Sequence, residues 1–226
     1  MKLKWIFSLI GFIQISFIAH SQVLLPHYPD SVFNAYYHQR VSFFNSIPKT
    51  NADIIFLGNS ITDGGEWAEL FNDVHIKNRG ISGDITAGVL NRLDEVAGRK
   101  PAKVFLLIGI NDLARNIQPD SVVKNIFLIA DYLQKQSPAT KLYVQSVLPV
   151  NDHYKMFAGH ASKAKQINEV NEILRKNEAG KQYTFINLFT FFANSDGKLK
   201  PALCNDGLHL MGPGYLLWNH LIFLYV

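Results

Sequence analysis

The chain has 226 residues, of which 48% are hydrophobic and 18% are charged, and its formal net charge is +4. This length accommodates one α/β domain with a sizeable core, and the composition is typical of globular proteins. The 22 Lys and Arg residues form no basic run that would bind phosphates, so nucleic acid is not an expected partner. Cys204 is the only cysteine, which excludes an intrachain disulfide and any metal site built on several cysteines.

Residues 1–21 have the pattern of a secretory signal peptide. Lys2 and Lys4 flank the start of a mostly apolar run from Trp5 to Ala19, and Ala19-His20-Ser21 places small residues where a signal peptidase cleaves. We expect cleavage near Ser21/Gln22 and export of residues 22–226 to the periplasm or the medium. Because cleavage removes two lysines and no acids, 20 basic residues remain against 18 acidic ones. A retained N-terminal anchor is the alternative, although the apolar run is short for a bilayer span.

An aromatic segment between Pro26 and Pro48 opens the expected mature domain. Its aromatic and apolar residues recur at helical spacing, which predicts a helix packed on the outside of the domain and capped by Asp30 or Ser31. The predicted helical face consists of Phe33, Tyr37, Val41 and Phe44.

Strand and helix patterns then alternate to the end of the chain. We expect strands at residues 54–57, 74–78, 103–110, 142–148 and 183–188, and helices at residues 66–71, 85–98, 121–136, 161–177 and 214–226. The uninterrupted apolar run 104–108 indicates a strand covered on both faces, as in a parallel sheet. The sequence therefore predicts a single α/β domain with a helix-flanked parallel sheet of about five strands.

A polar turn follows the first predicted strand. Gly58 ends the apolar run, and Ser60 comes directly after it, at the sheet edge where open α/β folds bind their ligands. A serine there can be a nucleophile if a base and an oxyanion hole lie beside it. The alternative is a serine that only caps the next helix.

Three further polar segments are expected at the same edge of a parallel sheet. The turn at Gly83 follows the second strand, Asn111 follows the third, and Asp206 precedes His209 by three residues just before the last helix. Asp206 at this spacing can bind Nδ1 of His209, which leaves Nε2 to take a proton from Ser60. The N–H groups of Ser60 and Gly83 and the amide of Asn111 are candidate donors to an oxyanion.

These segments resemble the four motif blocks of the SGNH (GDSL-type) hydrolases, in the order and at the spacings of that family. The blocks are Gly58-Asn59-Ser60-Ile61-Thr62, Asn78-Arg79-Gly80-Ile81-Ser82-Gly83-Asp84, Gly109-Ile110-Asn111-Asp112 and Asp206-Gly207-Leu208-His209. They span about 150 residues, and the chain looks most like the platelet-activating-factor acetylhydrolase-like and sialate O-acetylesterase-like branch.

The resemblance implies a flavodoxin-like three-layer α/β/α fold and ester hydrolysis without metal or cofactor. It implies Ser60 as nucleophile, Asp206 and His209 as its partners, and Gly83, rather than Gly80, as the oxyanion glycine. One departure is Asn59, where the family usually has Asp. We expect activity to survive this change, with altered electrostatics at Ser60.

The expected function is that of an exported serine esterase that removes small acyl groups, such as acetyl, from carbohydrate. Two alternatives stay open: a lysophospholipase or other lipid acylhydrolase, and a non-catalytic carbohydrate-binding protein on the same scaffold. Residues 149–159 have no clear period and are expected to form an exposed loop or a lid. Candidates for lining an acyl or sugar site are Trp67, Tyr154, Met156 and Phe157.

Overall fold

The computed structural model describes residues 25–50 and 52–226; the expected signal peptide lies outside these residues. Five parallel strands form one sheet in the order β2-β1-β3-β4-β5. This is the strand order of flavodoxin-like folds, and the predicted five-stranded parallel sheet is confirmed. The strands are β1 (Ile54–Gly58), β2 (Ile76–Gly80), β3 (Lys103–Leu107), β4 (Lys141–Gln145) and β5 (Thr184–Ile186).

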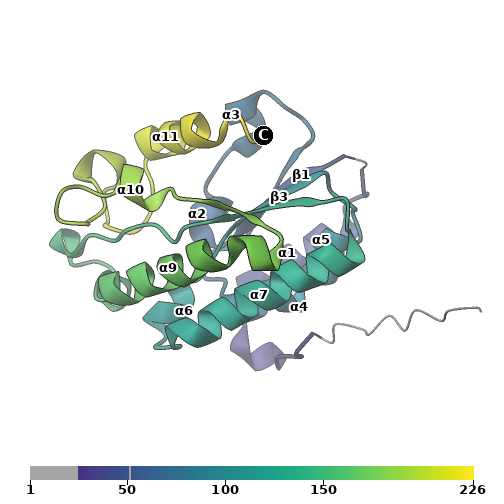
Figure 1. Cartoon of the computed structure of the whole chain (residues 1–226), viewed down its shortest axis with the longest axis horizontal. Helices are drawn as coiled ribbons and strands as arrows, with labels where there is room; N and C mark the ends of the chain where they lie inside the picture. The colour runs from purple at the N-terminus through teal and green to yellow at the C-terminus, as the bar shows by residue number, and fades with distance from the viewer. Residues whose placement is uncertain (1–24, 51) are drawn as a thin grey trace, which may run out of the picture.

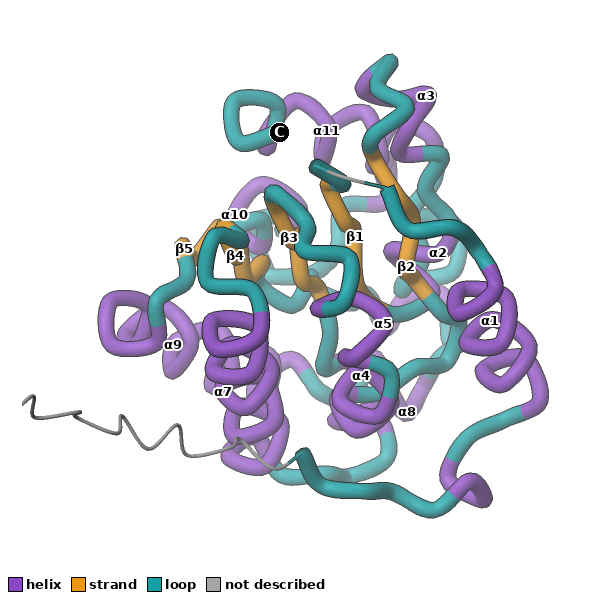
Figure 2. Tube along the Cα trace, turned by 90° about the vertical axis from the view of Figure 1, so that its right-hand side faces the viewer, coloured by secondary structure: helices purple, strands orange, loops and turns teal. Residues whose placement is uncertain are grey.

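Helices cover both faces of the sheet and complete the predicted three layers (Figures 1 and 2). Figure 2 shows α4, α5, α7 and α9 on one face, with α3 and α11 on the other. The helices of the described residues are α1 (Ala35–Ser46), α2 (Ser60–Asp63), α3 (Trp67–Phe71), α4 (Thr86–Asn91), α5 (Leu93–Ala97), α6 (Ile110–Ala114), α7 (Pro119–Gln136), α8 (Ala158–Ala161), α9 (Ala164–Lys181), α10 (Phe189–Phe192) and α11 (Gly212–Ile222). Short 3-10 turns lie at Asp30–Val32, Asp152–Tyr154 and Pro201–Leu203.

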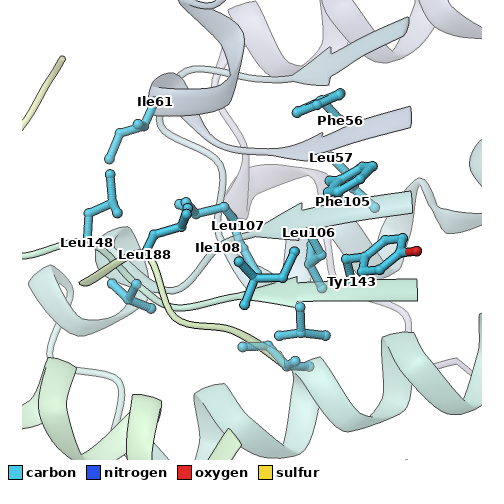
Figure 3. Close-up of a cluster of buried hydrophobic side chains, with 14 of the residues drawn as sticks. Phe56, Leu57, Ile61, Phe105, Leu106, Leu107, Ile108, Tyr143, Leu148 and Leu188 are labelled. Atoms are coloured by element: carbon cyan, nitrogen blue, oxygen red, sulfur yellow. The ribbon is translucent and has the colours of Figure 1, made fainter. Parts of the chain in front are cut away.

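Stacked aromatic rings connect the central strands on the face that α3 and α11 cover. The strand register places Phe56, Phe105 and Tyr143 side by side, and successive ring centroids lie 4.9 and 4.7 Å apart (Figure 3). Trp67 of α3 stacks on Phe56 at 4.2 Å and is 1% exposed. Trp67 therefore belongs to the core, and its predicted role in lining a substrate site is wrong.

Several element boundaries differ from the predictions: β3, β4 and β5 are shorter than expected, and α11 ends at Ile222 rather than at the last residue. Strand β2 starts two residues later than predicted, and Val74 is 79% exposed. The predicted helix 85–98 is divided into α4 and α5 at Arg92, whose side chain turns into the interior to bind Asp84. Helix α9 continues through Gly180 to Lys181, and the next residue, Gln182, adopts a left-handed conformation.

The N-terminal helix α1 buries Tyr37 and Phe44 as predicted, but Phe33 of the predicted helical face lies before the helix, and the helix is capped differently. Tyr37 and Phe44 are buried with Ile81, whereas Asp30 and Ser31 lie in a separate 3-10 turn. The cap is Asn34, whose side chain accepts the N–H of Tyr37 at 2.8 Å. This helix therefore lies beside the turn that carries Gly83.

Candidate active site

Ser60 lies at the junction of β1 and α2, at the carboxyl edge of the sheet. The buried side chain of Asn59 caps α2, because its Oδ1 accepts the N–H of Ile61 at 3.0 Å. Gly58 permits the sharp turn: a β carbon there would lie 2.3 Å from the carbonyl oxygen of Leu107. The local sequence thus turns the chain so that Ser60 is half-buried at the rim of the sheet.

Asp206 and His209 form a hydrogen-bonded pair within one tight turn. Oδ2 of Asp206 lies 2.7 Å from Nδ1 of His209, and Oδ1 accepts the N–H groups of Leu208 and His209, each at 2.8 Å. Gly207 makes this turn possible, because its φ is +85° and a β carbon would lie 2.1 Å from the carbonyl oxygen of Asn151. The spacing of three residues therefore folds the carboxylate back onto the imidazole.

Burial alone would raise the pKa of Asp206, but the hydrogen bonds from Leu208 and His209 outweigh it. The pKa of this carboxyl is lowered from its usual value, so Asp206 is ionised at neutral pH. An ionised Asp206 accepts the hydrogen of Nδ1, so in the neutral imidazole Nε2 of His209 is the nitrogen without a hydrogen. The resulting tautomer is the one that can accept a proton.

The structure brings His209 and Ser60 into contact across 149 residues of sequence. Nε2 of His209 lies 3.1 Å from Oγ of Ser60, which is within hydrogen-bond reach. The three side chains thus form a continuous chain from carboxylate to imidazole to hydroxyl. In this arrangement Nε2 can remove the hydroxyl proton as the oxygen attacks a carbonyl carbon.

Three candidate donors to an oxyanion lie at the same edge. Among the residues that the structure describes, the N–H groups of Ser60 and Gly83 donate to no protein acceptor. Gly83 is exposed and has a φ of +82°, a conformation that favours glycine. Asn111, in the first turn of α6, donates from Nδ2 to the carbonyl oxygen of Asp84 at 2.8 Å and retains a second N–H on that nitrogen.

A cleft of about 450 Å³ borders two of these donors, Gly83 and Asn111. Its lining also includes Met156, Phe157 and His160. The ring of Phe157 also lies edge-on to the ring of His209, with centroids 5.1 Å apart, so one residue of the cleft lining contacts the catalytic candidate His209. The predicted lining role of Met156 and Phe157 agrees with this cleft, whereas Tyr154 lies outside its lining and hydrogen-bonds the carbonyl oxygen of Cys204.

His160 is the residue at this site that sequence reasoning did not assign. Its Nε2 lies 2.9 Å from Oδ1 of Asn111. The histidine belongs to α8, which has no motif spacing and directly follows most of the segment 149–159 that is predicted to form a loop or a lid. No pattern in the sequence associates it with Asn111, because His160 stands outside the four motif segments.

Residues 25–50 and 52–226 contain no cluster of three or more His, Cys, Asp or Glu side chains arranged to hold a metal ion. Within the same residues, no helix combines the length and the apolar character that crossing a membrane requires.

The comparisons with known proteins agree with this geometry. The model of the GDSL-like lipase/acylhydrolase family matches residues 56–217. The platelet-activating factor acetylhydrolase IB subunit alpha1 of Rattus norvegicus is 29% identical over 170 residues, which cover 72% of this chain and 70% of the relative. A solved structure from Streptococcus pneumonia, described as a platelet activating factor, is 27% identical to this chain. Its TM-score is 0.77, and the match covers 84% of this chain and 92% of that chain.

A more distant structure shares the fold alone. It is a catalytic mutant of an acetylxylan esterase from Geobacillus stearothermophilus and is 17% identical to this chain. The TM-score is 0.56, and the match covers 78% of this chain and 95% of that chain.

Fold, site geometry and relatives together define the class of this protein, a carboxylic ester hydrolase of the α/β type. Because the family match covers more than half of its length, the chain belongs to the GDSL-like lipase/acylhydrolase family.

Proposed function

We propose that this acylhydrolase is an exported serine esterase that removes small acyl groups, acetyl in particular, from carbohydrate through an acyl-enzyme. The observation that carries the serine mechanism is the 3.1 Å contact between Nε2 of His209 and Oγ of Ser60. The acetyl preference draws support from relatives whose names specify an acetylhydrolase and an acetylxylan esterase. Export rests on the signal-peptide pattern of residues 1–21.

The first half of the reaction forms the acyl-enzyme. Oγ of Ser60 bonds to the ester carbonyl carbon while its proton passes to Nε2 of His209, and Asp206 stabilises the imidazolium that results. The carbonyl oxygen becomes an oxyanion and accepts hydrogen bonds from the N–H groups of Ser60 and Gly83 and from Nδ2 of Asn111. Nε2 then gives its proton to the leaving alcohol as the carbon–oxygen bond breaks.

Water completes the cycle. Nε2 of His209 takes a proton from a water molecule, whose oxygen attacks the acyl carbon bound to Ser60. The same donors stabilise the second oxyanion, and its collapse releases the acid and returns the proton to Oγ of Ser60. In this cycle each donor is typically worth about 3 kcal/mol of transition-state stabilisation.

A second candidate, hydrolysis of a lipid acetyl ester, is favoured by the platelet-activating-factor names of the relatives. A chain-length series of p-nitrophenyl esters first measures the acyl preference of the purified protein. Acetyl should be the best acyl group, and a strong preference for long chains would contradict the acetylesterase proposal. Acetate release from acetylated xylan and from an acetylated ether phospholipid then separates the two acceptors.

Two further measurements test the remaining parts of the proposal. A protein that binds glycans but releases no acid from any ester would instead be a carbohydrate-binding protein on this scaffold. Mass spectrometry of the protein recovered from the periplasm and the medium should find a mature N-terminus near Gln22. An intact Met1 terminus in the cell membrane would contradict export by cleavage.

A further inference from the structure

The amide of Asn111 is held at both of its ends. Nδ2 donates to the carbonyl oxygen of Asp84 at 2.8 Å, and Oδ1 lies 2.9 Å from Nε2 of His160. Because a carbonyl can only accept, the first contact identifies which end of the amide is nitrogen. Oδ1 must then be an acceptor, so Nε2 of His160 carries the hydrogen of the second contact.

This pair of contacts leaves one amide N–H of Asn111 for a ligand. Rotation of the side chain would break the bond to Asp84, the bond to His160, or both. A donor whose direction is fixed before the reaction needs no reorganisation when charge develops on the substrate oxygen. Hydrogen bonding at Oδ1 also polarises the amide and strengthens its remaining N–H as a donor.

We propose that His160 is a positioning residue of the oxyanion hole: its Nε2–H holds Oδ1 of Asn111 so that the free amide N–H faces the substrate oxyanion. The inference rests on the proposed serine mechanism and adds to it a residue outside the four motif blocks. It also gives the segment around α8 a function, since this segment completes the site rather than only covering it.

His160 is connected to the Asp206–His209 turn through Phe157, a residue of its own segment. The ring of Phe157 lies edge-on to His160, with centroids 5.6 Å apart, and edge-on to His209 at 5.1 Å. At the start of the same segment, the N–H of Asn151 donates to the carbonyl oxygen of Gly207 at 2.8 Å. The segment is therefore bound both to the Asp206–His209 turn and to Asn111.

The charge state of His160 is consistent with this role. Burial, and then the nearby His209, lower the pKa of His160 from its usual value, so its imidazole is neutral at pH 7. A neutral donor polarises Asn111 without opposing the positive charge that His209 acquires during the reaction. The donor is kept under acidic conditions too, because a protonated imidazole also carries a hydrogen on Nε2.

A double-mutant cycle on p-nitrophenyl acetate tests the proposal. The variants are His160→Leu, which removes the donor, His160→Gln, which keeps an N–H at similar reach, Asn111→Ala and the double variant His160→Leu/Asn111→Ala. The control is His153→Leu, an exposed histidine in the same segment. Thermal melting establishes that each variant is folded.

We expect His160→Leu to lower kcat roughly 3- to 30-fold with little change in KM, which is the effect of losing one supporting hydrogen bond. His160→Gln should recover most of that loss, and His153→Leu should match the original protein. In the Asn111→Ala background, the His160→Leu substitution should change kcat by less than about twofold, because its target is gone.

An unchanged kcat in His160→Leu, or an equal loss in both backgrounds, overturns the inference. If His160→Leu does not fold, His160→Gln decides: a kcat reduced as far as in Asn111→Ala overturns it too. Ser60→Ala keeps this outcome distinct from failure of the serine mechanism. An active Ser60→Ala variant refutes the mechanism, whereas an inactive one beside a fully active His160→Leu variant refutes only the role of His160.

Discussion

Arg92 binds the carboxylate of Asp84 in the interior, immediately behind the candidate oxyanion hole. Its Nη2 and Nε lie 2.9 and 3.0 Å from Oδ2 of Asp84, and both side chains are almost inaccessible to solvent. Nη2 also donates to the carbonyl oxygen of Gly58 at 3.2 Å. The pair therefore connects the strand before Ser60 to the turn that carries Gly83. The backbone carbonyl of Asp84 in the same turn accepts the hydrogen bond from Asn111.

We expect Arg92→Ala to destabilise the protein by about 3–5 kcal/mol, because it leaves the buried charge of Asp84 without a partner. Burial raises the pKa of Asp84 and Arg92 opposes that rise, so the variant should also retain a proton at Asp84 to higher pH. Urea unfolding measures the loss. The matched control is Arg175→Ala, which removes an exposed pair with Glu172 and should leave the midpoint unchanged. Equal midpoints for the two variants would show that the buried pair does not stabilise the fold.

Ser60→Ala should abolish ester hydrolysis and labelling by a fluorophosphonate, since both need the hydroxyl that His209 contacts. The fold should persist, because the alanine removes one half-buried oxygen and Asn59 still caps α2. The control is Ser46→Ala on α1, where the hydroxyl only donates to a backbone carbonyl of its own helix. Retained turnover in Ser60→Ala, with melting unchanged, would falsify the assignment of the nucleophile.

Alanine variants of two glycines with similar φ angles distinguish a loss of stability through backbone strain from a loss of catalysis. Gly83 has a φ of +82° and Gly197 a φ of +73°, so alanine at either position costs roughly 1–2 kcal/mol of stability. Nothing lies within 4 Å of a β carbon at Gly197, which belongs to none of the four motif segments, whereas one at Gly83 lies 3.4 Å from Nδ2 of Asn34. Gly197→Ala should therefore lower the melting temperature alone.

Gly83→Ala should lower the melting temperature to a similar extent and also reduce kcat by roughly 10- to 100-fold, because its N–H no longer keeps its direction toward the oxyanion. The two variants are compared by thermal melting and by initial rates on p-nitrophenyl acetate. If both lose activity in proportion to stability, the N–H of Gly83 is not a specific donor.

The sheet was predictable from the sequence because its central strands β1 and β3 are short and apolar on both faces. The run 104–108 has one reasonable interpretation, and alternation with amphipathic helices leaves little choice of topology. Boundaries that depend on a single tertiary contact were not predictable. The break between α4 and α5 lies at Arg92, which turns inward toward Asp84. A periodic apolar pattern does not predict that ion pair.

In the site, too, a residue whose place depends on a single tertiary contact was not predictable. Ser60, Gly83, Asn111, Asp206 and His209 stand in segments with motif spacing, and each segment follows a strand or precedes the last helix. His160 stands in a segment without any period, and its contact with Asn111 exists only because the segment after β4 folds back over the sheet edge. Such a contact can be found only in the three-dimensional structure.

Asp112 should make the stability of the protein depend on pH. Its side chain is fully buried and accepts the N–H and the hydroxyl of Thr86, but burial is the larger effect and raises its pKa from 3.8 to about 6. The folded protein thus binds a proton at a pH where the unfolded chain does not. The contribution of Asp112 to the free energy of unfolding is fully present below about pH 4 and is lost as the pH rises to about 6. Above that pH, the contribution of this group no longer changes.

Asp112→Asn removes this titration while keeping an acceptor for Thr86. Relative to the original protein, the free energy of unfolding of the variant should rise between pH 4 and pH 6, by at most about 3 kcal/mol, and then level off. Asp152→Asn is the control, because the hydrogen bond from Lys198 lowers the pKa of that exposed carboxyl and its contribution does not change above pH 4. Urea unfolding at pH 4, 5, 6 and 7 gives both difference curves. A difference curve for Asp112→Asn as flat as that of the control would mean that Asp112 is ionised in the folded protein throughout this range.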